Sequence, residues 1–297
     1  MTINSESSLW CDLCPHGCTL ELDEVGKCGA RRAGAEKIYL EGYGRICKLD
    51  VGTIEQQHIF HFAPGSRILS IGGYGCQLAC FYCENGLSPD GCKYFSAGAI
   101  ADLALSRKCI GVFMSYNEPC IYYEFLLDIA EKCHKRGLFF GINTNAFISE
   151  DPWLNIVDAV DVLNIDIKGN KNAYVECGAT SDTWSVYDKI FSAVHGSKHV
   201  EISTPVFFDS DLKYMDSVPK WMPVHLLDID DCVLFMGPLQ QRLKDNDFQY
   251  VYLHGNTLED TICPGCQKPI IRRTQNKVVI EFTHGCADCL TVVKTWN

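Results

Sequence analysis

CQLACFYC, residues 76–83, spaces three cysteines by three and then by two intervening residues. Thiolates at Cys76, Cys80 and Cys83 can bind three irons of a cubane 4Fe-4S cluster, and the fourth iron then has no protein ligand. Because electron-transfer cubanes use four cysteines, a cluster with three favours chemistry at the open iron. The sequence therefore predicts a catalytic iron–sulfur cluster on this loop.

The loop follows an apolar run, residues 68–72, that has the pattern of a short buried strand. Further strand-like runs are 110–116, 138–144, 162–168, 199–207, 224–229 and 249–253, and helix-like stretches are 97–107, 121–136 and 184–195. This alternation predicts an α/β fold with a parallel sheet or an open barrel of six strands plus an edge strand. Reactive loops then lie at the carboxyl ends of the strands.

Cysteine content divides the 297 residues into an N-terminal metal-binding segment (1–60), a core (61–255) and a C-terminal metal ribbon (256–297). The N-terminal residues lack a signal-peptide core, and no apolar run is long enough for a membrane span, so we expect a cytoplasmic protein with no membrane partner. Its 18 cysteines then fit reduced thiols and metal sites. The net charge of −11 argues against nucleic acid as a partner.

Two further cysteine groups have metal-ligand spacing. The first is Cys11, Cys14, Cys18 and Cys28, and the second is Cys263, Cys266, Cys286 and Cys289. Four thiolates suit zinc or a single iron. A structural role is favoured for the first group, although its place before the cluster loop leaves substrate handling open. The second group frames a hairpin (270–273 and 278–282, turning at Gln275-Asn276) and predicts a zinc ribbon or a rubredoxin-like site; dithiol redox chemistry is the alternative.

The seven remaining cysteines are scattered along the chain, and we expect them to be free thiols of the core or the surface. They are Cys47, Cys92, Cys109, Cys120, Cys133, Cys177 and Cys232.

Polar residues end several of the expected strands. Glu118 stands before Pro119 at a strand-to-helix junction, where it is either an ordinary helix acid or a carboxylate that meets an ammonium group. Asp166 and Lys168 share one face of their strand and form either a structural ion pair or part of a binding site. His225 opens the sixth strand, and a single histidine there is more often structural than functional.

The cysteine loop and these strand-end residues together resemble the radical S-adenosylmethionine (SAM) superfamily. The resemblance implies that the open iron chelates SAM, and that reductive cleavage of SAM gives a 5′-deoxyadenosyl radical that abstracts hydrogen from a substrate. The residues that it assigns to SAM binding are Tyr82, Asn117, Glu118, Asn143, Asn145, Asp166, Lys168 and His225.

Residues 61–66, 116–119, 164–169 and 250–252 are more specific. They resemble the AmmeMemoRadiSam-system radical SAM family, the pyruvate formate-lyase activating enzymes, and the radical SAM arginine C-methyltransferase of methyl-coenzyme M reductase. The implied fold is a partial (β/α)6 TIM-like radical SAM barrel, flanked by an N-terminal Cys-rich metal loop and a C-terminal zinc-ribbon or rubredoxin-like hairpin. The last family also implies mononuclear iron in the N-terminal site. Glu84-Asn85 and Ala146 depart from the family patterns and leave the substrate undefined.

The implied substrate is a peptide or protein, and the implied electron donor is a flavodoxin or ferredoxin. Glycyl-radical activation and C–H modification are both compatible with the sequence. C-methylation would require cobalamin, for which the chain has no recognisable fingerprint. The alternatives outside this class are a non-catalytic zinc-binding adaptor and a thiol oxidoreductase.

Overall fold

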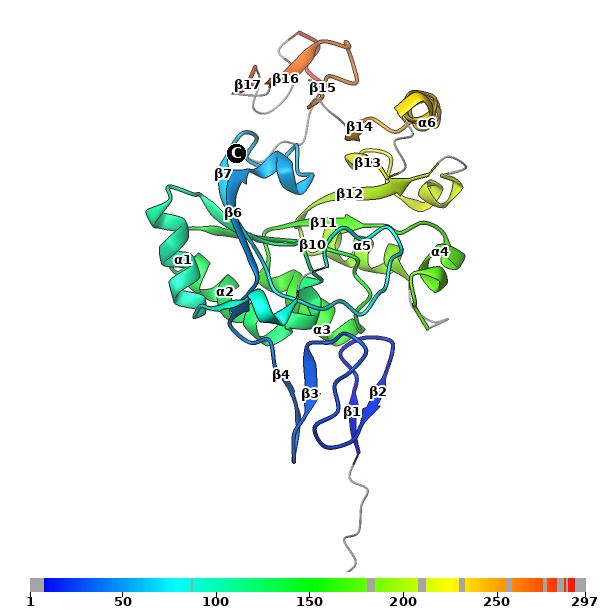
Figure 1. Cartoon of the computed structure of the whole chain (residues 1–297). Coiled ribbons are helices and arrows are strands. Elements are labelled where there is room, and N and C mark those ends of the chain that lie inside the picture. The colour runs from blue at the N-terminus through cyan, green and yellow to red at the C-terminus, as the bar shows by residue number, and fades with distance from the viewer. Residues whose placement is uncertain are drawn as a thin grey trace, which may run out of the picture.

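The computed structural model describes residues 8–86, 88–180, 185–207, 212–229, 233–254, 258–274, 277–281, 286 and 288–291. A central sheet with its helices lies between two small β-rich ends, one formed by the N-terminal strands and the other by the last strands of the chain (Figure 1). None of the described helices is long and apolar enough to cross a lipid bilayer.

The central sheet has the strand order β14-β13-β12-β11-β10-β9-β7-β6. Its strands are β6 (Lys48–Thr53), β7 (Arg67–Gly72), β9 (Gly111–Met114), β10 (Phe139–Thr144), β11 (Val162–Asp166), β12 (His199–Val206), β13 (Val224–Asp228) and β14 (Val251–His254). From β7 to β14 all neighbours pair in parallel, whereas β6 pairs antiparallel with β7. The expected parallel strands and the α/β fold class are therefore confirmed, and β6 is an addition from the N-terminal segment.

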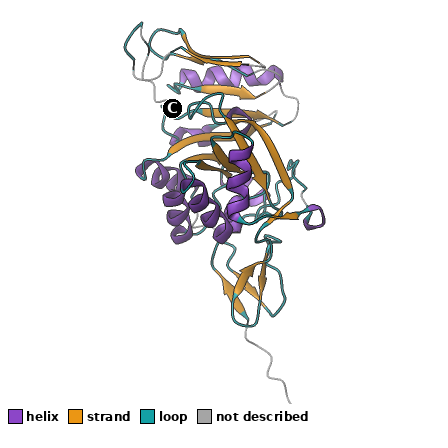
Figure 2. Cartoon of the chain, turned by 90° about the vertical axis from the view of Figure 1, so that its left-hand side faces the viewer, coloured by secondary structure: helices purple, strands orange, loops and turns teal. Residues whose placement is uncertain are grey.

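Helices connect the parallel strands (Figure 2). They are α1 (Ala97–Ser106), α2 (Tyr123–His134), α3 (Glu150–Ala159), α4 (Lys171–Glu176), α5 (Val186–His195) and α6 (Val233–Asp245), with short 3-10 helices η1 (Ile54–Gln57), η2 (Pro89–Gly91), η3 (Pro119–Tyr122) and η4 (Lys213–Ser217). In α2 the apolar side chains of Phe125, Leu126, Ile129 and Cys133 are fully buried. The three predicted helices correspond to α1, α2 and α5; the predicted start at Trp184 lies outside the described residues.

The two β-rich ends are small. Strands β1 (Leu9–Cys11), β2 (Cys18–Leu20), β3 (Arg31–Ala33) and β4 (Ile38–Leu40) form two antiparallel pairs, and β15 (Thr261–Ile262), β16 (Pro269–Thr274) and β17 (Lys277–Ile280) form an antiparallel sheet. Pairing of β16 with β17 is the hairpin expected from the sequence, although its turn at Gln275-Asn276 lies outside the described residues. The segment boundaries at residues 60 and 255 remain predictions.

Cys47 and Cys92 form a disulfide, which corrects the expectation that both are free thiols. The reason is the register of two short strands, β5 (Arg45–Ile46) and β8 (Lys93–Tyr94). They pair antiparallel, with Ile46 opposite Lys93. Cys47, the residue after Ile46, therefore faces Cys92, the residue before Lys93. Residues 45 positions apart in the sequence are thereby brought together.

Candidate active site

A cavity of about 510 Å³ lies at the carboxyl ends of the parallel strands. Its walls come from the residues that follow β7, β9, β10, β11 and β13. The lining includes the predicted residues Cys76, Cys80, Tyr82, Cys83, Asn117, Glu118, Asn143, Asn145, Asp166 and Lys168. The structure thus brings the cysteine loop and the polar strand ends together around one space.

The sulfur of Cys76 receives hydrogen bonds inside this cavity. The Leu78 backbone N–H lies 3.4 Å from Cys76 Sγ, and the Asn145 side-chain amide lies 3.6 Å away. Such donors favour a thiolate, whereas burial raises the pKa of Cys76 and favours the thiol. A bound metal resolves this conflict because a coordinating thiol is deprotonated. Three thiols on one loop facing a cavity are a donor set that fits a 4Fe-4S cluster.

Cys177, one of the scattered thiols of the sequence, is a neighbour of this loop. It is 1% exposed, and its carbonyl accepts a 2.7 Å hydrogen bond from the Ala79 backbone N–H. A hydrogen bond with the Cys177 thiol lowers the pKa of Cys80 below its usual value. No motif spacing signals this contact, because Cys177 ends α4 and approaches Cys80 only through the fold.

Glu118 is the N-cap of η3, and Pro119 begins that helix as expected. Its Oε1 accepts from the Cys120 backbone N–H at 3.0 Å and from the Thr144 hydroxyl at 2.6 Å. Its Oε2 accepts from the Asn145 backbone N–H at 2.9 Å. The side chain also lines the cavity, and its burial raises the pKa of the carboxyl. Glu118 therefore both caps a helix and presents a carboxylate to the cavity.

Asp166 and Lys168 form a partly buried ion pair through Asp166 Oδ2. Burial lowers the pKa of Lys168, but the Asp166 charge and the other acidic groups nearby outweigh it, so the net shift is upward. The second carboxylate oxygen, Asp166 Oδ1, is buried without a hydrogen-bond partner in the described part of the chain. Because buried polar atoms are normally paired, this oxygen is suited to a hydrogen-bond donor on a bound molecule.

His225 does not line the cavity. It is fully buried, with Nε2 2.8 Å from Glu201 Oε2 and Nδ1 2.7 Å from His254 Nε2. His58 lines the cavity instead, and its ring centroid lies 4.4 Å from that of His254. No sequence signal indicates His58, because it follows η1 outside every strand-end motif.

The N-terminal cysteines lie on and after the β1–β2 hairpin, where Cys11 is paired with Cys18. Burial raises the pKa of Cys14 to about 12, and the nearby thiols of Cys28, Cys11 and Cys18 contribute to the rise. The four residues are thus neighbours. Within the described ranges, however, their sulfurs do not converge as tightly as those of the C-terminal group.

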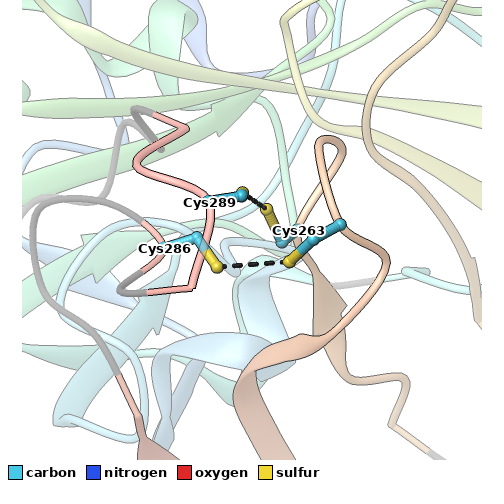
Figure 3. A group of neighbouring side chains, drawn as sticks. Cys263, Cys286 and Cys289 are labelled. Atoms are coloured by element: carbon cyan, nitrogen blue, oxygen red, sulfur yellow. Dashed lines mark hydrogen bonds between the residues drawn. The ribbon is translucent and has the colours of Figure 1, made fainter.

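The C-terminal cysteines Cys263, Cys266, Cys286 and Cys289 place their sulfurs within 4.8 Å of one another (Figure 3). Cys263 Sγ lies 3.5 Å from Cys289 Sγ, and Cys266 Sγ lies 3.3 Å from Cys286 Sγ. Four converging thiols have the composition of a closed structural site for zinc or for a single iron.

The radical SAM superfamily matches residues 70–215, which hold the cysteine loop and the strand ends of the cavity. Residues 70–215 therefore form a radical SAM domain, and proteins of the radical SAM superfamily are enzymes. This assignment removes the non-catalytic adaptor as an alternative.

Two curated proteins are similar in sequence. An uncharacterized protein of Methanocaldococcus jannaschii is 28% identical over 298 residues, covering 90% of this chain and 88% of its own length. The 4-hydroxyphenylacetate decarboxylase activating enzyme of Clostridioides difficile is 36% identical over 58 residues, which are 20% of this chain and 18% of that enzyme.

Solved structures with partial similarity include QueE from Escherichia coli, with 15% identity, a TM-score of 0.49, and coverage of 71% of this chain and 94% of QueE. A domain of pyruvate-formate lyase-activating enzyme from Bacteroides vulgatus has 17% identity and a TM-score of 0.41, covering 49% of this chain and 99% of that domain. SuiB from Streptococcus suis has 13% identity in its complex with precursor peptide SuiA, with a TM-score of 0.46 and coverage of 61% and 46%.

Proposed function

We propose that this radical SAM enzyme binds a 4Fe-4S cluster through Cys76, Cys80 and Cys83 and modifies a peptide or protein by glycyl-radical activation or C–H modification. The observation that carries the proposal is the single cavity that contains the three cysteines, Glu118 and the Asp166–Lys168 pair. Zinc or a single iron in each four-cysteine site, and a flavodoxin or ferredoxin as electron donor, complete the proposal.

A cluster held by Cys76, Cys80 and Cys83, together with bound SAM, would supply the difficult radical chemistry. The protein's own residues bind and orient. An ionised carboxylate has about four lone-pair sites, and Glu118 uses three of them in the hydrogen bonds described. Its remaining site and Asp166 Oδ1 can accept from the ammonium and hydroxyl groups of SAM.

A group of aromatic side chains beside the cavity supports the proposal that the substrate is large. Phe81 of the cluster loop is 73% exposed, and its ring centroid lies 5.4 Å from that of Phe207 and 5.1 Å from that of Tyr82. Exposed aromatic side chains next to a concave site are typical of surfaces that bind other chains. Part of the chain is similar to an enzyme that is named as the activator of a decarboxylase, and this similarity also supports a protein substrate.

The test is an anaerobic reaction of the reduced, reconstituted enzyme with SAM and candidate peptides, analysed by mass spectrometry. We expect 5′-deoxyadenosine and a peptide of changed mass, while S-adenosylhomocysteine would point to methyl transfer and hence to the cobalamin alternative. The variant with Cys76, Cys80 and Cys83 all changed to Ala should lose SAM cleavage and keep its terminal metals. 5′-Deoxyadenosine formation by that variant would refute the cluster assignment.

A further inference from the structure

His16 lies between two of the N-terminal cysteines and contacts the cluster loop. Its Nε2 is 2.7 Å from the Gln77 carbonyl oxygen, and its Nδ1 is 2.8 Å from the Thr180 hydroxyl. A carbonyl oxygen can only accept, so Nε2 carries the proton in this contact and the neutral ring accepts from Thr180. The imidazole therefore connects the Cys14–Cys18 turn to the residue that follows Cys76.

Gln77 is in turn linked to the proposed cluster ligand Cys76 through Asn145. Its side-chain amide donates to the Phe147 carbonyl at 2.8 Å and to Asn145 Oδ1 at 3.2 Å. Asn145 in turn donates to Cys76 Sγ. Gln77 is only 4% exposed, so its conformation is fixed on several sides.

A second N-terminal cysteine, Cys28, contacts the residue that precedes Cys76. The Cys28 carbonyl oxygen packs against Gly75, where a Cβ atom would clash with it. Gly75 has φ +80°, a conformation that glycine adopts at little cost. The residues directly before and after Cys76 thus both touch the segment that holds the N-terminal cysteines.

We propose that metal binding by Cys11, Cys14, Cys18 and Cys28 clamps the loop around Cys76 and keeps the 4Fe-4S cluster in place, with His16 as the positioning residue. This inference rests on the proposed function, because it needs the cluster. It assigns the N-terminal site a task at the active site, beyond that of holding its own segment together. The C-terminal site has no such contact with the cluster loop among the described residues.

The first experiment removes the N-terminal metal. Cys11→Ser/Cys18→Ser is compared with wild type and with Cys266→Ser, the matched control that removes one ligand from the other four-cysteine site. Acid-labile sulfide is measured per folded monomer after anaerobic reconstitution, together with the rate at which an iron chelator bleaches the cluster. We expect faster bleaching in the N-terminal variant and the wild-type rate in Cys266→Ser. Equal rates in all three proteins would overturn the inference.

The second experiment leaves all cysteines in place, in case the first variant does not fold. Thr180→Val and His16→Leu each remove hydrogen bonds of the clamp, and His134→Leu is the control for loss of an imidazole remote from the loop. Loss of one such hydrogen bond should speed bleaching about fivefold. N-terminal metal content should stay at the wild-type level. Unchanged bleaching, or loss of the N-terminal metal from His16→Leu and Thr180→Val, would overturn the positioning role.

These readouts separate the two proposals. A wild-type protein that takes up no sulfide would overturn the proposed function and the clamp with it. If wild type takes up a cluster but no N-terminal variant bleaches faster than wild type, the clamp alone is overturned.

Discussion

Glu118 is a side chain in which the requirements of the fold and of the cavity meet. Its three hydrogen bonds hold η3 to the end of β10, and all of them depend on a carboxylate that only accepts. An amide in its place would direct its NH2 group at one or more of these donors, which leaves buried groups unpaired.

We expect Glu118→Gln to weaken SAM binding more than it lowers cluster content. The free energy of unfolding should also fall by about 1–3 kcal/mol, the cost of an unsatisfied buried group. SAM titration, iron and sulfide analysis and urea unfolding measure the three quantities. Glu131→Gln, at an exposed carboxylate paired with Lys132 and Lys135, is the control. Unchanged SAM affinity would show that Glu118 serves only the helix.

Much of the cavity could be predicted from single residues, because each strand-end motif carries its own signal. Asn117, Asn143 and Asp166 stand where an apolar run stops, and parallel strands bring such positions to one edge. His58, Cys177 and His16 reach the site through tertiary contacts and have no local pattern. His225 was assigned to the cavity by resemblance, but its place at the start of β13 turns it toward Glu201 instead.

Three adjacent strands, β12, β13 and β14, together with the residue after η1, build a buried group of ionisable side chains. Glu201 accepts hydrogen bonds from His199 and His225, and His225 contacts His254. Burial lowers the pKa of His58 to about 3 and also lowers the pKa of His225 and His254. Hydrogen bonds from His199 and His225 outweigh the burial of Glu201 and hold its pKa well below the usual range. The Arg273 guanidinium, from β16, lies over the Phe60 ring, which in turn contacts the rings of His225 and His254.

Stability should therefore fall as the pH drops below about 6.5. In that range the unfolded chain binds more protons at His58, His225 and His254 than the folded chain does, so acid favours unfolding, down to a pH of about 3 for His58. The slope is about 1.4 kcal/mol per pH unit for each such group. His58→Asn removes one group at a position with φ 55°, which Asn tolerates. Urea unfolding between pH 7.5 and 5 should give this variant a smaller slope, and equal slopes would exclude His58 as a source.

The C-terminal ribbon is an element attached to the core by Arg273. The Arg273 side chain donates to the Phe60 carbonyl at 2.6 Å and lies 3.7 Å from the buried Glu55 carboxylate. A metal bound by the four cysteines would hold the hairpin that presents this arginine.

Removing that metal should unfold the ribbon before the sheet. Structural zinc contributes on the order of 10 kcal/mol to the folding of small zinc domains, so the hairpin has little stability without it. Cys266→Ser, or chelation of wild type, should add an unfolding step at lower temperature and expose the segment after residue 258 to protease. Cys133→Ala, in the α2 core, is the control for loss of a thiol outside the ribbon. A melting curve like that of wild type would reject the structural role.

The predicted elements are those with strong local patterns. Strands β7 to β14 are short apolar runs, and α2 has a clear apolar face. β6 was not found because Leu49 and Val51 are its only large apolar residues and most of the strand is exposed. Pro152 and Pro238 obscured α3 and α6, although Pro152 lies in the first turn, where proline is tolerated.

At the scale of the whole molecule, the Cys47–Cys92 disulfide joins β5 to β8 across 45 residues. A loop of this length, when closed, restricts the unfolded chain by about 4 kcal/mol in the chain-entropy account. Cys47→Ser/Cys92→Ser should lose about this much free energy of unfolding. Reductant should bring wild type to the same urea midpoint and leave the variant unchanged. A wild-type midpoint insensitive to reductant would contradict the prediction.

The same bond makes a closed ring of main chain that contains Cys76, Cys80 and Cys83. A protease that nicks the chain anywhere within that ring produces two pieces that stay covalently tied. A nicked enzyme would then migrate as a single species until a thiol reductant is added. Only after reduction would the two pieces separate, with the cysteine loop in one or the other of them.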